Sequence, residues 1–73
     1  MRIVTRSQIA DTFDGFGSDK VWKFTNGEIW EQARYAYHYH YAYRPNVTIR
    51  AVSGHYEIEV QGCGPTVEVR RVR

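Results

Sequence analysis

Hydrophobic and polar residues alternate along most of this chain, and one stretch alternates almost without interruption. Tyrosine occupies every second position there, at Tyr35, Tyr37, Tyr39, Tyr41 and Tyr43. Because successive side chains of a β-strand point to opposite faces, this pattern predicts a long strand with all of these rings on one face. The strand is expected to end at the Arg44-Pro45 step, since proline lacks the N–H that a sheet ladder needs.

The same period of two predicts strands elsewhere, and no segment has the pattern of a helix. Leucine, which favours helices, is absent from the sequence. Glycine-containing stretches predict tight turns at residues 53–54 and 62–65 and a loop over residues 14–20. Residues 1–7 form either a short strand or a loose arm. The other predicted strands are Gln8–Phe13, Val47–Val52, His55–Gln61 and Thr66–Val72.

A β-hairpin is predicted over Lys20–Gln32, where Asn26-Gly27 separates two aromatic-rich runs. Its register depends on the length of the turn. A two-residue turn puts Trp30 on the opposite face from Trp22, whereas a three-residue turn makes them direct partners on one face. We favour the two-residue turn, which leaves Trp30 on the surface.

The chain of 73 residues is long enough for one domain, spanning residues 1–73. Consecutive strands joined by tight turns form an antiparallel meander. A flat sheet of this kind would leave one face and two edges bare, and small proteins avoid this by curling the sheet. The predicted fold is therefore all-β, a small antiparallel meander that closes into an SH3-like barrel of five or six strands.

The composition indicates the cellular setting. The single cysteine, Cys63, excludes an internal disulfide, which fits a reducing compartment. No apolar run approaches the ~20 residues of a membrane helix, and the first residues lack the apolar core of a signal peptide. We expect a cytoplasmic protein with no membrane contact.

The tyrosine strand is long for a domain of this size, which predicts self-association. Fully extended, residues 34–44 would span ~36 Å, whereas the domain should be roughly 29 Å across. The strand must either bend sharply and serve two sheets, or protrude and pair with another chain. Together with the thin core of so short a chain, this predicts a homo-oligomer, a homodimer in particular.

Few residues are arranged for catalysis or for metal binding. His38 and His40 share one strand face, and His55 could join them as a third metal ligand, but no cysteine or carboxylate completes a known ligand spacing. Two histidines that fill an amphipathic face are the favoured reading. Cys63 lies in a turn without a base to activate it. We therefore predict no enzyme activity and no cofactor.

The tyrosine row has two readings: core and cross-strand packing, which is the common role of aromatic residues in sheets, or a binding platform, because aromatic rings flanked by arginine suit both proteins and bases. We expect the row to change role along its length, with some tyrosines capping the core and others lying on a binding surface.

The favoured function is a non-enzymatic module that self-associates and binds a protein partner. The alternative is a weak binder of single-stranded nucleic acid, although the glutamates dilute the positive field and the net charge is only +2. The predicted binding surface consists of Trp30, Tyr35, Tyr37, Tyr39, Tyr41, Tyr43, Arg34, Arg44 and Arg50.

Two stretches, KVWKFTNGEIWEQ and YHYHYAYRPNVTI, carry a family resemblance. With its NG-x-x-W hairpin and its YHYAYRP strand, the chain resembles a group of short bacterial proteins of unassigned function, some of them encoded in mobile gene cassettes. The similarity runs from about Ile9 to the end of the sequence. It implies a small, all-β, SH3-like, stand-alone domain, and it brings no catalytic residue or ligand.

Overall fold

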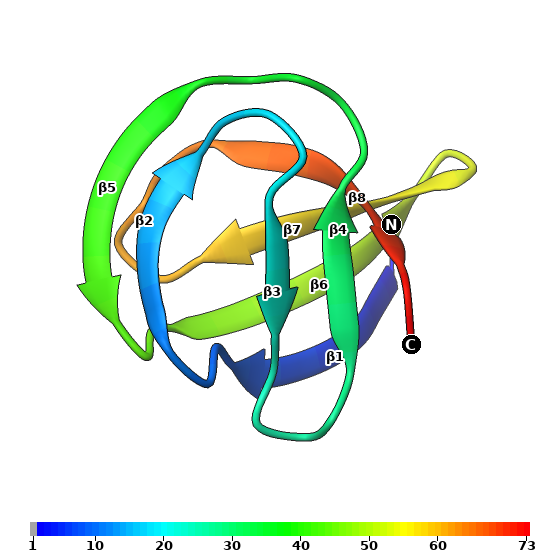
Figure 1. Cartoon of the computed structure of the whole chain (residues 1–73). Helices are drawn as coiled ribbons and strands as arrows, with labels where there is room; N and C mark the ends of the chain where they lie inside the picture. Colours follow the sequence, from blue (N-terminus) through cyan, green and yellow to red (C-terminus); the bar gives the residue numbers. More distant parts are fainter. Residues whose placement is uncertain (1) are drawn as a thin grey trace.

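The computed structural model describes residues 2–73, which form eight β-strands, all paired antiparallel (Figure 1). The all-β antiparallel prediction is confirmed, but the number of five or six strands is wrong. The predicted strand Gln8–Phe13 is also wrong in its bounds, because Gln8 ends one strand and the next runs from Thr12 through DGF at positions 14–16, which were predicted as a loop. The strands are β1 (Arg2–Gln8), β2 (Thr12–Phe16), β3 (Val21–Lys23), β4 (Ile29–Gln32), β5 (His38–Tyr43), β6 (Asn46–Val52), β7 (His55–Val60) and β8 (Thr66–Arg71).

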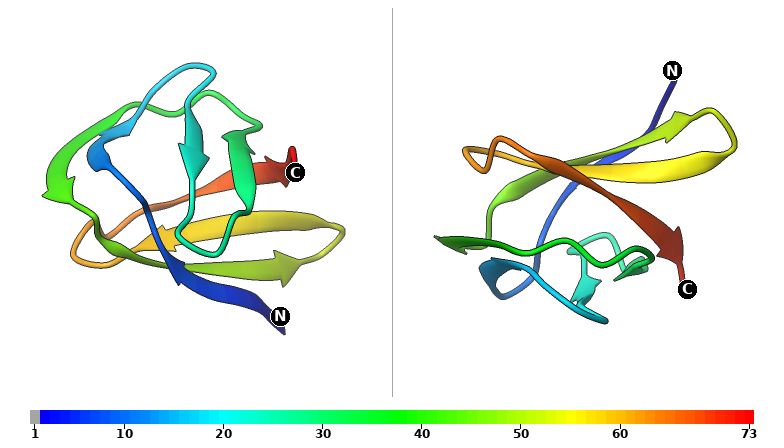
Figure 2. Two further views of the ribbon diagram at one scale, coloured as in Figure 1. Left: turned by 60° about the horizontal axis from the view of Figure 1, so that its bottom comes forward. Right: turned by 90° about the horizontal axis from the view of Figure 1, so that it is seen from above.

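The strands form one large sheet and one small sheet. The large sheet has six strands in the order β1-β6-β7-β8-β4-β3, and the small sheet pairs β2 with β5. The predicted meander is therefore wrong as a description of the whole domain, because only β6-β7-β8 and β3-β4 are neighbours in chain order, and the other pairs join strands far apart in the sequence. Viewed from above, β6, β7 and β8 lie in one layer, and β2, β3, β4 and β5 lie in the other (Figure 2). No helix in the described part of the chain could cross a membrane.

The two end strands of the large sheet come together, because the sheet curls. Ile9, just after β1, bridges Phe24, just after β3. Two backbone hydrogen bonds flank this bridge: Ala10 N–H donates to Lys23 O, and Thr25 N–H donates to Gln8 O, each at 2.8 Å. These two bonds satisfy backbone groups that an open sheet would leave exposed at its ends.

The predicted long tyrosine strand is wrong in its length, because β5 spans only His38–Tyr43, residues 33–37 are irregular, and the chain turns into a separate strand of the large sheet after β5. β5 pairs with β2, and its continuation β6 pairs with β1 and β7. The corner lies at Arg44, which has a φ of 50°, and at Pro45. Hydrogen bonds from Arg44 N–H to Asp11 O (3.1 Å) and from Ile9 N–H to Pro45 O (3.0 Å) hold the corner. The domain therefore stays compact, with principal extents of 28 × 25 × 21 Å.

The hairpin formed by β3 and β4 has the register that we did not favour. Trp22 lies directly opposite Trp30, and Phe24 N–H donates to Glu28 O at 2.8 Å across a three-residue turn. Gly27 in that turn has a φ of 93°, a conformation that glycine adopts without strain. The physical reason for this register is burial, since it places Trp22, Trp30 and Phe24 together inside the protein.

The core lies between the two layers and is rich in aromatic side chains. The later strands contribute Ile49, Ile58 and Val69, among others, to the core, whereas Tyr56 remains 37% exposed. Tyr56 packs edge-on against Trp30, with the ring centroids 5.3 Å apart. The core cluster consists of Ile9, Phe13, Phe16, Trp22, Phe24, Trp30, Val47, Ile49, Ile58, Val60, Cys63, Val67 and Val69.

The burial of both tryptophans predicts their fluorescence behaviour. Trp22 is 5% exposed and Trp30 is 1% exposed, so a charged quencher cannot reach either ring in the folded protein. We expect iodide to quench the tryptophan emission of the native protein weakly, and that of the urea-unfolded protein strongly. A native-state Stern–Volmer slope about midway between weak quenching and that of the unfolded protein would contradict this register, because in the other one Trp30 is on the surface while Trp22 stays inside.

Candidate interaction surface

Five tyrosines form an exposed row along β5 and the segment before it. We call this row the tyrosine face, and its members are 60% to 73% exposed. The prediction that they share one face is confirmed, because the residues between them are only partly exposed and point to the other side. The expectation that some of them cap the core is wrong, because none is buried and Ala36 and His40 of the opposite row lie against the core instead. The tyrosine face consists of Tyr35, Tyr37, Tyr39, Tyr41 and Tyr43.

The opposite row anchors this segment to the core. Ala36 packs against the core cluster, and the ring of His40 lies beside Phe13 with the centroids 6.4 Å apart. No aromatic contact within residues 2–73 pairs one ring of the tyrosine face with another ring. The phenol rings therefore project from an anchored strand with their faces accessible to solvent.

A buried glutamine positions the start of the row. Gln32 is 3% exposed, and its Oε1 accepts a hydrogen bond from Gly17 N–H at 3.0 Å. Its Nε2 donates to Gly17 O (2.9 Å), Arg34 O (2.9 Å) and Ala36 O (3.2 Å). This side chain ties the irregular segment that carries Tyr35 to the turn after β2 and to the end of β4.

Sequence reasoning missed Gln32, although a signal for it was present. In the register that places Trp30 inside, Gln32 follows two residues later on the same inward face. A polar side chain at an inward position needs hydrogen-bond partners there. The preference for the other hairpin register concealed this signal.

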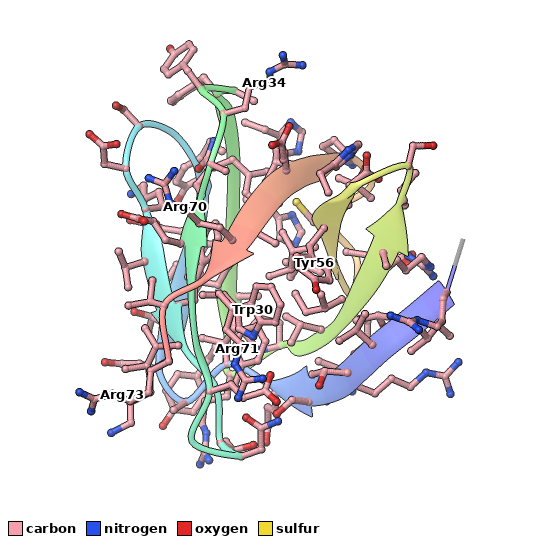
Figure 3. The ribbon with its side chains drawn as sticks, turned by 90° about the vertical axis from the view of Figure 1, so that its right-hand side faces the viewer. Trp30, Arg34, Tyr56, Arg70, Arg71 and Arg73 are labelled. Carbon is pink, nitrogen blue, oxygen red and sulfur yellow. The ribbon has the colours of Figure 1, made fainter. Side chains whose placement is uncertain are left out.

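Trp30 does not belong to the binding surface, which corrects our prediction. It lies in the core, and its indole Nε1–H donates to Glu28 Oε1 at 2.9 Å. The same carboxylate accepts a hydrogen bond from the Thr5 hydroxyl at 3.3 Å. Its other close neighbour is Arg71, whose Nη2 lies 3.9 Å from Glu28 Oε2 (Figure 3). Trp30 therefore stabilises the domain from within.

The predicted arginines divide into two groups. Arg34 and Arg44 are exposed at the two ends of the tyrosine face, and neither is among the ion pairs of residues 2–73. Arg50 lies in β6, in the other sheet, and forms an ion pair with Glu59. Only Arg34 and Arg44 therefore adjoin the tyrosines.

The arginines near the chain end are partly occupied by carboxylates. Arg70 Nε donates to Glu31 Oε1 at 2.7 Å, and this hydrogen bond raises the pKa of the Arg70 guanidinium above its ordinary value. Arg71 lies near Glu28, and Arg73 ends the chain on the same side (Figure 3). These pairs reduce the positive charge that β8 offers to a polyanion.

His55 lies next to a carboxylate, and Cys63 is a buried free thiol. His55 Nε2 lies 3.0 Å from Glu57 Oε2, and within the described residues no three potential ligands come together to hold a metal ion. Cys63 is buried, and this burial raises the pKa of its thiol. A raised pKa lowers the fraction of reactive thiolate, which makes Cys63 a poor nucleophile.

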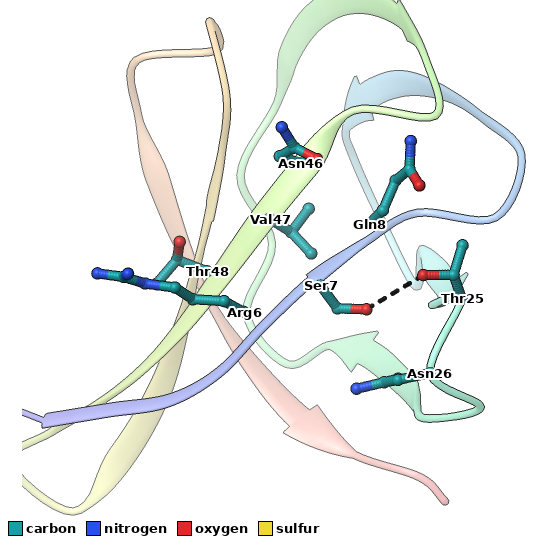
Figure 4. Close-up of a pocket in the computed structure, with 8 residues that line it drawn as sticks. All are labelled: Arg6, Ser7, Gln8, Thr25, Asn26, Asn46, Val47 and Thr48. Carbon is teal, nitrogen blue, oxygen red and sulfur yellow. Dashed lines mark hydrogen bonds between the residues drawn. The ribbon is translucent and has the colours of Figure 1, made fainter.

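A shallow, open depression of about 600 Å³ lies between β1, β6 and the turn of the β3–β4 hairpin (Figure 4). Ser7 Oγ and Thr25 Oγ1 are 3.5 Å apart across it. Its lining contains one charged residue, Arg6, and no carboxylate, histidine or cysteine, so it offers no acid or base for chemistry. The lining residues are Arg6, Ser7, Gln8, Thr25, Asn26, Asn46, Val47 and Thr48.

The chain matches no protein-family description, no curated protein and no solved structure. The resemblance to short bacterial proteins therefore stays a prediction, and the candidate surface has to be judged from its own geometry.

Proposed function

We propose that this protein is a non-enzymatic interaction module that self-associates and binds a protein partner through the tyrosine face. The observation that carries the proposal is the exposure of five tyrosines in one row, at 60% to 73% each. Tyrosine is enriched in protein interfaces and among the residues that dominate binding energy. Contiguous apolar patches of this kind on a soluble protein commonly mark an interaction site.

The size of the surface supports the same proposal. An aromatic side chain buries about 150–250 Å² when it is fully covered. At the exposed fractions observed, five rings offer roughly 500–900 Å². A standard protein interface buries about 800 Å² on each partner. The tyrosine face is thus large enough to supply most of one side of such an interface.

The anchoring of the row supports binding by a surface that is already ordered. Tyrosine has only two side-chain torsions, so little conformational entropy is lost when its ring is covered. The inward contact of Ala36 and the hydrogen bonds of Gln32 hold the backbone in place before a partner arrives. Pre-organisation of this kind improves affinity because less ordering is left for the binding step.

The SH3-like barrel is part of the proposal for this domain. The curl of the six-stranded sheet, the bridge between Ile9 and Phe24, and the corner at Pro45 support it. Small barrels of this class commonly serve as binding modules, which is an argument by analogy and adds to the tyrosine face without replacing it.

A second candidate function is weak binding of single-stranded nucleic acid. It is favoured by Arg34 and Arg44, which stand at the two ends of the tyrosine face as exposed cations outside the ion pairs of the described residues. Bases stack on aromatic rings, and arginine contacts phosphate. The carboxylates that neutralise Arg50 and Arg70 weaken this candidate.

Site-directed photo-crosslinking in the natural host tests partner binding. We expect a benzoylphenylalanine at position 37 to form a discrete adduct with another protein, because Tyr37 is 73% exposed on the tyrosine face. The same probe at position 21 is the control, since Val21 is 55% exposed in the other sheet. The adduct should disappear in the double variant Tyr39→Ser/Tyr41→Ser.

The outcomes of this experiment separate the candidates. Adducts that contain only this chain, or equal labelling from positions 37 and 21, contradict binding of a protein partner. Fluorescence anisotropy with single-stranded DNA and RNA at two salt concentrations tests the second candidate. Binding that weakens steeply with salt and is lost in Arg34→Gln/Arg44→Gln would favour nucleic acid over protein.

A further inference from the structure

The outer edge of β5 has no strand partner among the described residues. β5 pairs only with β2, in a sheet of two strands, and it lies at the outside of the molecule (Figure 1). Tyr43 faces Thr12 across this sheet, and Arg44 N–H donates to Asp11 O just beyond the pair. This is the geometry of a non-hydrogen-bonded pair, so the N–H and C=O of Tyr43 point away from β2.

This edge has one device that discourages pairing between molecules, a register irregularity of β5 between Tyr39 and Ala42, but from Tyr35 to Tyr43 it carries no lysine, proline or acidic residue. Soluble proteins protect an exposed edge with lysine or other charges, with proline, or by covering it. Between Arg34 and Arg44 the chain contains only tyrosine, alanine and histidine. The end strands of the large sheet, by contrast, are joined by the bridge between Ile9 and Phe24.

We infer that two copies of the chain associate by antiparallel pairing of their β5 edges about a twofold axis. The pairing forms a continuous four-stranded sheet, β2-β5-β5-β2, whose outer side carries the tyrosine faces of both copies. This inference rests on the self-association in the proposed function and names the edge that is used. Binding of a partner protein to the tyrosine face is a separate claim.

A second copy fits this edge because the strand is complementary to itself. With Tyr41 on the twofold axis, Tyr39 lies opposite Tyr43 of the second copy, so aromatic side chains meet across the junction, which favours strand pairing. A slip of one residue would put the core-facing row of one copy beside the tyrosine face of the other. In the favoured register the charged residues lie at the ends of the paired strands, away from the axis.

The twofold symmetry provides a matched pair of variants for the backbone edge. Tyr43→Pro and Tyr43→Thr both remove the phenol, but only proline removes the N–H that points outward. Each change occurs twice in a symmetric dimer. Loss of two hydrogen bonds should weaken dimerisation about 30-fold in Tyr43→Pro relative to Tyr43→Thr.

A second matched pair probes the twofold axis with little risk to folding, because Tyr41 is 60% exposed. Tyr41→Lys places two like charges opposite one another in the dimer, whereas Tyr41→Thr keeps a strand-favouring residue without charge. We expect Tyr41→Lys to dimerise more weakly than Tyr41→Thr, and we expect added salt to reduce the difference.

Size-exclusion chromatography with light scattering over a dilution series measures these equilibria. We expect the mass to approach twice 8.6 kDa at high concentration, and the Tyr43 amide to be protected from hydrogen exchange only in the dimer. A wild-type protein that stays monomeric throughout overturns the inference and leaves the crosslinking test of partner binding standing. A dimer that tolerates both Tyr43→Pro and Tyr41→Lys overturns it as well, because another surface would then form the dimer.

Discussion

Replacing Gly15 by alanine is expected to cost about 3–5 kcal/mol of folding free energy, which approaches the whole stability of so small a domain. A Cβ atom at this position would lie 2.9 Å from His40 N and 3.0 Å from Tyr39 Cα, and closer still to the carbonyl oxygen of His38. All of these are backbone atoms of β5, so relief requires the two strands of the small sheet to move apart. Gly15 also has a φ of 113°, a backbone conformation in which residues other than glycine are strained.

A matched substitution separates the steric clash from the backbone strain. Gly27 has a φ of 93°, but a Cβ atom there would have no neighbour within 4 Å. We expect Gly27→Ala to cost about 1 kcal/mol. Urea unfolding followed by tryptophan emission measures both variants. If the two substitutions lower the free energy of unfolding equally, the close approach of β2 and β5 at Gly15 is not the cause of the loss.

Replacing Gln32 by methionine is expected to cost about 3–4 kcal/mol, because one side chain serves four backbone groups. Methionine has nearly the same length but leaves Gly17 N–H and the carbonyls of Gly17, Arg34 and Ala36 without this partner. Each buried group left unsatisfied costs about 1–3 kcal/mol, and water will recover part of the loss.

The effect of Gln32→Met should be concentrated at one end of the tyrosine face. Hydrogen exchange should accelerate over residues 33–37 more than in β7, because Gln32 ties that segment to Gly17. Gln61→Met is the control: Gln61 is exposed and accepts a hydrogen bond from Asn46 Nδ2 at 2.9 Å, so its replacement should cost less than about 1 kcal/mol. Similar losses in the two variants would contradict the role assigned to Gln32.

The local pattern of the sequence predicted that the five tyrosines share one face, but it did not predict that all of them are exposed. Strict alternation over residues 35–43 determines which side chains share a face, and the chemistry of the intervening residues decides which face is covered. His40 and Ala36 are small or flat enough to lie against the core, while five phenols with polar tips remain outside. The shared face of the tyrosines required no knowledge of distant contacts.

The remaining features depend on contacts between residues far apart in the chain. Both hairpin registers are compatible with Asn26-Gly27, and burial of Trp30 between β8 and the rest of the core selects one of them. In the sequence the segment DGF resembles a turn. Nothing local indicates that Gly15, with its φ of 113°, lies in a strand that pairs closely with β5. The role of Gln32 depends on where Gly17 is placed, 15 residues earlier in the chain.

The corner at Arg44 and Pro45 connects the strand that carries the tyrosine face directly to a strand of the core. β5 passes through it directly into β6, whose Val47 and Ile49 are 3% and 0% exposed. A ligand that holds β5 therefore also resists the opening of β6, so occupancy at the periphery will raise the temperature at which the whole domain melts. Binding partners without any optical signal can thus be found by screening for a delay in thermal unfolding.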